Sequence, residues 1–178
     1  MKTAYDDRSM VSIDTSDIDA LLNFFRSKDG AARQWAREQL VRIGKPAVPR
    51  LLPLLSHPDD MIRWEACKTL EKIRDPRAAS ALAAALLDDN MDVRWVAADA
   101  LIELEHRAIV PVLEIIERHY DSVLLREAAH HVLTNLKQAG FLDEDLERVM
   151  EALMVNELPS KAAFAAIRIL DDRRMKVR

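Results

Sequence analysis

Side chains that could catalyse a reaction or bind a metal are few in this sequence and widely spaced. Its five histidines are His57, His106, His119, His130 and His131. Glu127 and His131 are four positions apart, so on a helix they would share one face and could contact the same metal ion. A single pair of this kind supplies too few ligands for a stable site. We therefore expect no bound metal.

Nucleophilic and phosphate-binding chemistry is equally unsupported. The one cysteine, Cys67, falls between Ala66 and Leu70 in an apolar stripe, so we expect it to pack as a small hydrophobic residue. Three glycines are too few and too scattered to form a glycine-rich phosphate loop, and no nucleophile lies near a base in a recognisable arrangement. These observations predict no catalytic residue and no cofactor, and therefore a protein that is not an enzyme.

One type of charged residue does recur regularly. Arginines stand 30, 31 and 32 positions apart, at Arg33, Arg63, Arg94 and Arg126. Each would lie at the edge of an apolar helix face, where its guanidinium could bond to acceptors in its own or the next repeat and hold the repeats in register. We favour this structural role. The alternative is a row of sites that bind anions.

The arginines belong to a repeat of roughly 31 residues that runs through most of the chain. The segment Ile62-Arg63-Trp64 returns as Val93-Arg94-Trp95, and Leu70 and Leu82 return as Leu101 and Leu113. Each unit is expected to form a helix, a short break and a second helix, because apolar residues recur at helical spacing on both sides of a proline or glycine. Neither apolar stripe is wide enough to be buried within one unit, so the units must stack.

The start of each first helix carries a capping signal. Four residues before each recurring arginine is a side chain that accepts hydrogen bonds from the first turn of a helix, namely Asp29, Asp59, Asn90 and Ser122. The expected breaks between the two helices are at Gly44-Lys45-Pro46, Asp75-Pro76, Glu105-His106-Arg107 and Gln138-Ala139-Gly140.

The two ends of the repeat array are expected to be incomplete. Residues 17–25 match a second helix and predict a half-repeat at the start, and residues 160–170 predict one more first helix after the second helix of unit four at 144–153. We expect a single repeat domain over residues 14–170. Residues 1–13 are expected to be flexible and residues 171–178 to form a polar tail.

The unit resembles the HEAT-like repeats, in the short bacterial variant found in phycobilin lyase subunits. The resemblance rests on Val93-Arg94 with Ala100-Leu101 in a first helix, and on the second-helix segment Pro46-Ala47-Val48-Pro49-Arg50-Leu51-Leu52. It implies an all-α, right-handed α-α superhelix of about four helix pairs plus terminal half-repeats. It also implies that second helices line the concave side and first helices the convex side. The HEAT-like deoxyhypusine hydroxylases hold iron through His-Glu pairs, and this sequence contains no His-Glu dipeptide.

The outward positions of the second helices are the candidate binding surface. They combine small, apolar and polar side chains where a merely solvated face would be charged. The candidate partner-binding residues are Arg50, Pro53, His57, Ala81, Ala84, Asp88, Val112, Ile115 and His119. All nine are expected to be exposed.

Tryptophan is a second candidate for binding. Trp64 and Trp95 occupy equivalent positions in their units, and Trp35 lies one step away from that position. Their helical angles place them toward the convex side. We favour packing across their own helices, with an aromatic platform for a partner as the alternative.

Composition narrows the class of partner. The 178 residues carry a net charge of −4, and the second helices mix Arg50, Arg77 and Arg118 with acidic residues, so we expect no nucleic-acid binding. The sequence shows no signal peptide and no apolar run of membrane-spanning length, so we expect no membrane association and a cytoplasmic protein.

Together these features predict a non-catalytic scaffold that binds a protein or a peptide on its concave surface. The alternative is a phycobilin-lyase-like or lyase-accessory subunit that binds a tetrapyrrole or a chromophore-bearing protein.

Overall fold

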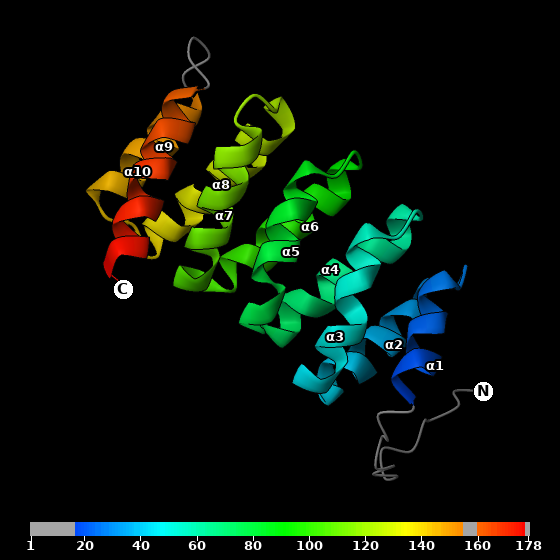
Figure 1. The fold of residues 1–178 in the computed structure, drawn as a ribbon. Coiled ribbons are helices and arrows are strands. Elements are labelled where there is room, and N and C mark those ends of the chain that lie inside the picture. The colour runs from blue at the N-terminus through cyan, green and yellow to red at the C-terminus, as the bar shows by residue number, and fades with distance from the viewer. Residues whose placement is uncertain (1–16, 155–159, 177–178) are drawn as a thin grey trace, which may run out of the picture.

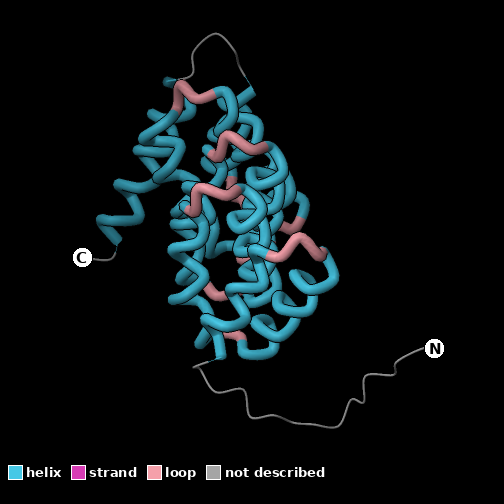
Figure 2. The backbone as a smooth tube through the Cα atoms, turned by 90° about the vertical axis from the view of Figure 1, so that its right-hand side faces the viewer, coloured by secondary structure: helices cyan, strands magenta, loops and turns pink. Residues whose placement is uncertain are grey.

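The computed structural model describes residues 17–154 and 160–176, and every regular element in this part of the chain is a helix. Figure 2 shows that only short loops connect the helices. The predicted all-α fold is therefore confirmed. Residues 1–13, expected to be flexible, lie outside the described residues. None of the described helices is long and apolar enough to cross a membrane.

The helices alternate as the repeat predicts. A half-repeat of α1 (Asp17–Asn23) and η1 (Phe24–Arg26) precedes the first full unit. The first helices of the four units are α2 (Gly30–Ile43), α4 (Asp60–Ile73), α6 (Met91–Ile102) and α8 (Val123–Gln138). In unit one the first helix is followed by η2 (Lys45–Ala47), α3 (Val48–Leu51) and η3 (Leu52–Ser56). In unit two it is followed by η4 (Pro76–Ala78), α5 (Ala79–Ala84) and η5 (Ala85–Leu87). In unit three it is followed by η6 (Glu105–Ala108) and α7 (Ile109–His119). The chain closes with α9 (Glu144–Met154) and α10 (Ser160–Lys176).

The four predicted capping residues all cap their helices. The side chains of Asp29 and Asp59 accept hydrogen bonds of 2.9 Å from the amides of Ala31 and Met61. Asn90 accepts from the Asp92 amide at 2.8 Å, and Ser122 accepts from the Leu125 amide at 3.3 Å. Because each cap satisfies a backbone donor that the helix itself leaves free, it fixes the residue at which each first helix begins.

The first helices end where the sequence predicts breaks. Gly44 and Gly140 adopt positive φ angles of 71° and 80°, which glycine tolerates without steric strain. At the other two breaks Arg74 and Glu105 adopt φ angles of 55° and 56°. At these residues the chain turns from each first helix toward the next helix.

Proline shapes the second helices of the array. Pro49 and Pro53 each remove a backbone donor in the second helix of unit one, which is a short α-helix, α3, that continues as the 3₁₀ segment η3. In unit three Pro111 lies in the first turn, where a proline is tolerated, and α7 runs as a continuous helix of 11 residues.

The helices form two layers that share one core. First helices pack against one another along the array, α2 on α4, α4 on α6 and α6 on α8, and the second helices form the other layer (Figure 1). The core between the layers is built from leucine, isoleucine, valine and alanine, and includes Leu40, Leu70, Leu101 and Leu133, all at most 1% exposed. The predicted superhelix of stacked helix pairs is confirmed.

The last two helices differ from the sequence prediction. Residues 144–153 were expected to form the second helix of unit four, and residues 160–170 a further first helix. In the structure α9 packs against α8, whereas α10 packs against both α7 and α9. Helix α10 therefore takes the place beside α7 in the second-helix layer (Figure 1). Its buried alanines Ala162, Ala163 and Ala166 have small side chains, which allow close approach of neighbouring helices.

Helix α10 also extends to Lys176 and so includes most of the segment 171–178 that was expected to form a polar tail. Asp171 and Asp172, at the start of this segment, are exposed.

The prediction that the outward residues of α7 are exposed is wrong for two of them. Val112 is 0% exposed and Ile115 is 8% exposed, so neither lines an open surface as expected. Their counterparts in unit two, Ala81 and Ala84, are half-buried and exposed. Valine and isoleucine are larger than alanine, and α7 has helices α5 and α10 as neighbours in its layer, so the larger side chains fill the space between helices.

This difference predicts unequal effects of one substitution at two equivalent positions. Ile115→Asp should lower the free energy of unfolding by about 3 kcal/mol or more, because it buries a carboxylate without a partner. Ala84→Asp should change it by less than about 1 kcal/mol, because that position is open to water. Urea denaturation measures both values, and equal effects at the two positions would contradict the burial of the α7 face.

Candidate functional site

The recurring arginines lie at the junctions between units. Arg33 on α2 donates from Nε to Glu65 on α4 at 3.0 Å and from Nη1 to the Ser27 carbonyl at 2.7 Å. Its side chain therefore contacts both the loop before its own unit and the first helix of the next. Arg37, one turn later on α2, forms a second ion pair with the Glu65 carboxylate.

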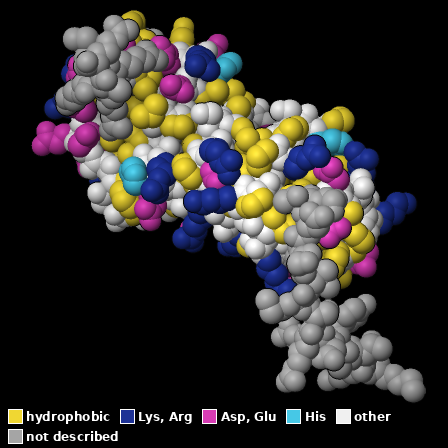
Figure 3. All heavy atoms as spheres, turned by 60° about the horizontal axis from the view of Figure 1, so that its bottom comes forward, with side chains coloured by type: hydrophobic (Ala, Val, Ile, Leu, Met, Phe, Trp, Pro, Cys, Tyr) yellow, Lys and Arg dark blue, Asp and Glu magenta, His cyan; other side chains and the backbone are white. Residues whose placement is uncertain are grey.

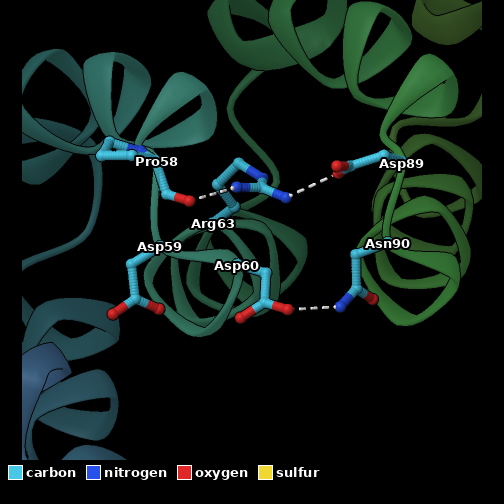
Figure 4. A pocket seen from close by; sticks show the side chains of 6 residues that line it. All are labelled: Pro58, Asp59, Asp60, Arg63, Asp89 and Asn90. Carbon is cyan, nitrogen blue, oxygen red and sulfur yellow. Dashed lines mark hydrogen bonds and ion pairs between the residues drawn. The ribbon is translucent and has the colours of Figure 1, made fainter.

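Arg63 makes the densest set of contacts. Its guanidinium donates two parallel hydrogen bonds to Asp88 at 2.7 and 2.8 Å, one to Asp89 at 3.0 Å and one to the His57 carbonyl at 2.8 Å. Burial alone would raise the pKa of Asp88, but hydrogen bonds from Arg63 and from the Asn90 amide hold the pKa of that carboxyl below its ordinary value. Figure 4 shows Arg63 reaching from α4 to Asp89 on the following loop. Arg63 thus joins unit two to the loop that opens unit three.

The other two arginines differ from this pattern. Arg94 on α6 donates from Nη1 to the carbonyls of Asp88 and Asp89 at 2.7 and 3.0 Å, so the same loop is fixed from both of its sides. The Nε atom of Arg126 is buried and has no hydrogen-bond partner within the described part of the chain. Within the described residues, Arg33 and Arg63 therefore contact the adjoining unit or its loop, Arg94 fixes the loop that opens its own unit, and Arg126 makes no such contact through Nε.

The acceptor on which the first junction depends was not predicted from the sequence. Glu65 is 2% exposed and accepts from both Arg33 and Arg37. A signal for it was present, because the equivalent positions in the other units hold Trp35, Val96 and Ala128. A carboxylate at a position that is otherwise apolar predicts a buried ion pair.

The nine residues of the predicted binding surface fall into three groups. Four are exposed: Arg50, Pro53, Ala84 and His119. His57, Ala81 and Asp88 are half-buried, and two of these are engaged in the junction loops: Asp88 by Arg63, and His57 as acceptor of the Asp59 amide at 3.0 Å. Val112 and Ile115 are buried, so they do not belong to the binding surface. The open positions therefore concentrate on units one and two.

A hollow of about 380 Å³ adjoins these open positions. It lies between the half-repeat and unit one, with Leu22 and Arg26 on one side and Pro49, Arg50 and Pro53 on the other. Arg50 bridges its two walls through an ion pair of 2.8 Å with Asp19 on α1. Both side chains of this pair are well exposed, so the bridge contributes little stability and can exchange for an outside partner.

The three tryptophans have different environments. Trp64 packs partly against the core, with the guanidinium carbon of Arg37 5.6 Å from its ring centre. Trp35 and Trp95 are 48% and 45% exposed, and their rings contact Phe24 and His131 edge-on at 5.4 and 4.6 Å. Large aromatic surface therefore remains open on the first-helix layer.

The titratable groups weighed for chemistry do not converge. His131 contacts Trp95 and lies 3.9 Å from Asp99, and burial lowers the pKa of the adjacent His130. Within residues 17–154 and 160–176, no three side chains of histidine, cysteine, aspartate or glutamate gather as metal ligands would. Cys67 is fully buried, and burial raises the pKa of its thiol to about 12, which keeps it protonated and unreactive at neutral pH.

The two edges of the array differ in their charged residues, although acidic side chains occur at both, including Asp75 and Glu103 at the turns within units. The loops between units, which we call the loop edge (residues 27–29, 57–59, 88–90 and 120–122), carry aspartates at the starts of the first helices. The turns within units, which we call the turn edge, carry Lys45, Arg74, Arg77 and Arg107. Figure 3, which brings the turn edge forward, shows lysine and arginine side chains gathered near the middle of that face. At the loop edge the aspartates complement the positive ends of the first-helix dipoles.

Comparison with known proteins agrees with this architecture. Residues 18–102 match the family model for HEAT repeats. No protein with a curated description matches the chain. The predicted resemblance to HEAT-like repeats is confirmed over residues 18–102, and the described helices form an all-α solenoid.

Two solved structures are similar to the chain. One is a chain from the complex of CpcE and CpcF of phycocyanin lyase from Nostoc sp. PCC7120, with 27% sequence identity, a TM-score of 0.62, and coverage of 88% of this chain and 98% of that chain. The other is an engineered protein with 19% identity and a TM-score of 0.46, over 85% of this chain and 77% of that chain.

The junction geometry predicts the effect of removing Arg63. Arg63→Ala should lower the free energy of unfolding by about 2 kcal/mol at neutral pH, because Asp88 loses a charged partner while its carboxylate stays largely buried. The exposed Arg118→Ala serves as the control and should change it by less than about 0.5 kcal/mol.

The ion pair of Arg63 with Asp88 also determines how the free energy of unfolding depends on pH. The folded-state pKa of Asp88 lies below its ordinary value of 3.8, so the contribution of the pair is complete at neutral pH and is lost as the pH falls through the folded-state pKa. The difference in the free energy of unfolding between wild type and Arg63→Ala should therefore shrink below about pH 4. A difference that is constant with pH would show that Asp88 is not the partner that matters.

Proposed function

We propose that this protein is a non-catalytic scaffold that binds a protein or a peptide on the open part of its second-helix layer, around Pro53 and Ala84. The observation that carries the proposal is the hollow of about 380 Å³ beside Pro53 and the exposed Arg50. In HEAT-like repeats the second helices line the concave side, so this surface corresponds to the inside of the superhelix.

The chemistry of the surface suits a polypeptide. Pro53 and Ala84 have small apolar side chains, which leave room for side chains of a partner. Arg50 adds a guanidinium whose exposed ion pair with Asp19 can be replaced by a carboxylate of the partner. The surface ends at α7, where Val112 and Ile115 are buried, so the contact covers the half-repeat and units one and two.

Two further observations support a protein partner. Repeat units that each contact only their neighbours form an extended rigid surface, which is how solenoid proteins bind. The similar solved chain comes from a complex of two different subunits, CpcE and CpcF. A scaffold that assembles with another polypeptide is consistent with both.

The second candidate function is a lyase-like or lyase-accessory subunit that acts on a tetrapyrrole or a chromophore-bearing protein. It is favoured by one specific observation, the similarity to a phycocyanin lyase chain over 98% of the length of that chain. The protein would then hold the chromophore or the acceptor protein on the same surface.

Site-specific photo-crosslinking tests the proposal and separates the two functions. The crosslinking amino acid p-benzoylphenylalanine replaces Pro53 or Ala84 in the second-helix layer, and Glu38 on the first helix α2 as a matched exposed control. In the native cell we expect the same polypeptide to be crosslinked from positions 53 and 84 and not from position 38, in a colourless complex.

The other outcomes are equally informative. A crosslinked phycobiliprotein subunit, or visible absorbance retained in the complex, would support the lyase-like function instead. Crosslinks from position 38 alone would contradict binding through the second-helix layer.

A further inference from the structure

The hollow between the half-repeat and unit one has an apolar interior. Leu22, Leu54 and Ile62 line it, and each of them belongs to the hydrophobic core or packs against it. Pro49 and Pro53 line it from α3 and η3, and because a proline ring fixes the backbone φ angle, this wall is rigid. A volume of about 380 Å³ is at the small end of the range for ligand pockets. The hollow is therefore a preformed apolar site for an anchoring side chain of a partner.

Two exposed arginines line the same hollow, Arg26 at the end of η1 and Arg50 on α3. Arg26 forms no ion pair with any side chain among the described residues. Arg50 pairs with Asp19, and both side chains of that pair are 61% exposed. The lining therefore carries an excess of positive charge, and charge complementarity selects a carboxylate.

The repeat itself does not require these two arginines. The equivalent positions in the next unit hold Ser56 and Ala81, whereas the arginines at the junctions between units recur along the chain. Arg26 and Arg50 also make no hydrogen bond to the main chain of another unit within the residues that the structure describes. Their guanidinium groups are therefore available to a ligand from outside.

We propose, on the basis of the scaffold function given above, that this hollow binds an acidic segment of the partner protein. An apolar side chain of that segment enters the hollow between Leu22 and Pro53. Aspartate or glutamate residues beside it bind Arg26 and Arg50. A guanidinium can donate two parallel hydrogen bonds to one carboxylate, so the arginines select acidic sequences, and burial of the apolar side chain supplies affinity.

Selection from a phage-displayed library of random linear peptides tests this chemistry. The peptides are selected on the wild-type protein, and those that also bind the double variant Arg26→Gln with Arg50→Gln are removed. We expect the remaining peptides to share a leucine, isoleucine or phenylalanine flanked by aspartate or glutamate. A basic or uncharged consensus, or a selection that yields no binder, would contradict the proposal.

A synthetic peptide of the selected sequence then measures the role of the free arginine. Arg26→Gln should weaken its binding by about tenfold or more, because a charged, bidentate contact is lost. Arg118→Gln removes the same charge from an exposed position on α7 and should leave the affinity unchanged. Equal losses from the two variants would show a general attraction between the peptide and basic residues.

The exposed ion pair of Asp19 with Arg50 allows a test in the opposite direction. Asp19→Asn should strengthen binding of the peptide by about threefold, because it releases Arg50 from a competing carboxylate. Asp145→Asn breaks the similarly exposed pair with Arg148 on α9 and should have no effect. All of these substitutions are at exposed side chains, so the melting temperature should stay the same. Weaker binding by Asp19→Asn would show that the hollow receives a cation.

Two further results separate this proposal from the functions considered above. Peptides that are lost with Ala84→Arg and retained with Arg26→Gln would overturn the role of the hollow and leave the scaffold function intact. If no peptide is selected and the linear tetrapyrrole biliverdin binds the wild type but not Arg26→Gln, the arginines hold a pigment instead of a polypeptide.

Discussion

The buried carboxylate of Glu65 constrains how the first two units stack. It is 2% exposed between α2 and α4, and a charge in such a place is tolerated only when it is paired and hydrogen-bonded. Arg33 and Arg37 of the preceding unit supply that pairing, so α4 can settle in one register relative to α2. From α4 the constraint continues along the array, because Arg63 binds Asp88 and Asp89, and Arg94 binds the carbonyls of the same two residues.

This chain of junctions explains how a sequence of short helices presents defined surfaces. Each unit buries its narrow apolar stripes only against the neighbouring units. A fixed register at each junction therefore fixes the distances between exposed side chains of successive units. The second-helix layer is open near Pro53 and Ala84 and closed at Ile115, while the first-helix layer presents the exposed rings of Trp35 and Trp95. Exposed apolar side chains therefore lie on both layers of one array.

Local chemistry made much of the fold predictable from sequence. The capping residues, such as Asp59 and Asn90, and the breaks at Gly44 and Gly140 act within a few positions along the chain, so their types and spacing are sufficient evidence. The exchange of places between α9 and α10 depends on long-range packing against α7, which periodicity does not report. The burial of Ile115 was missed for the same reason, and the role of Glu65 was missed because its partners stand about 30 residues away.

A double-mutant cycle on Arg33 and Glu65 tests most directly whether buried ion pairs set the register of the array. The free energies of unfolding of Arg33→Ala, Glu65→Ala and the double variant are measured against wild type by urea denaturation. The account predicts a coupling energy of about 1–3 kcal/mol, so that the double variant is more stable than the sum of the single losses implies. A coupling energy near zero would show that the two side chains contribute independently and that this ion pair does not set the register of α2 against α4.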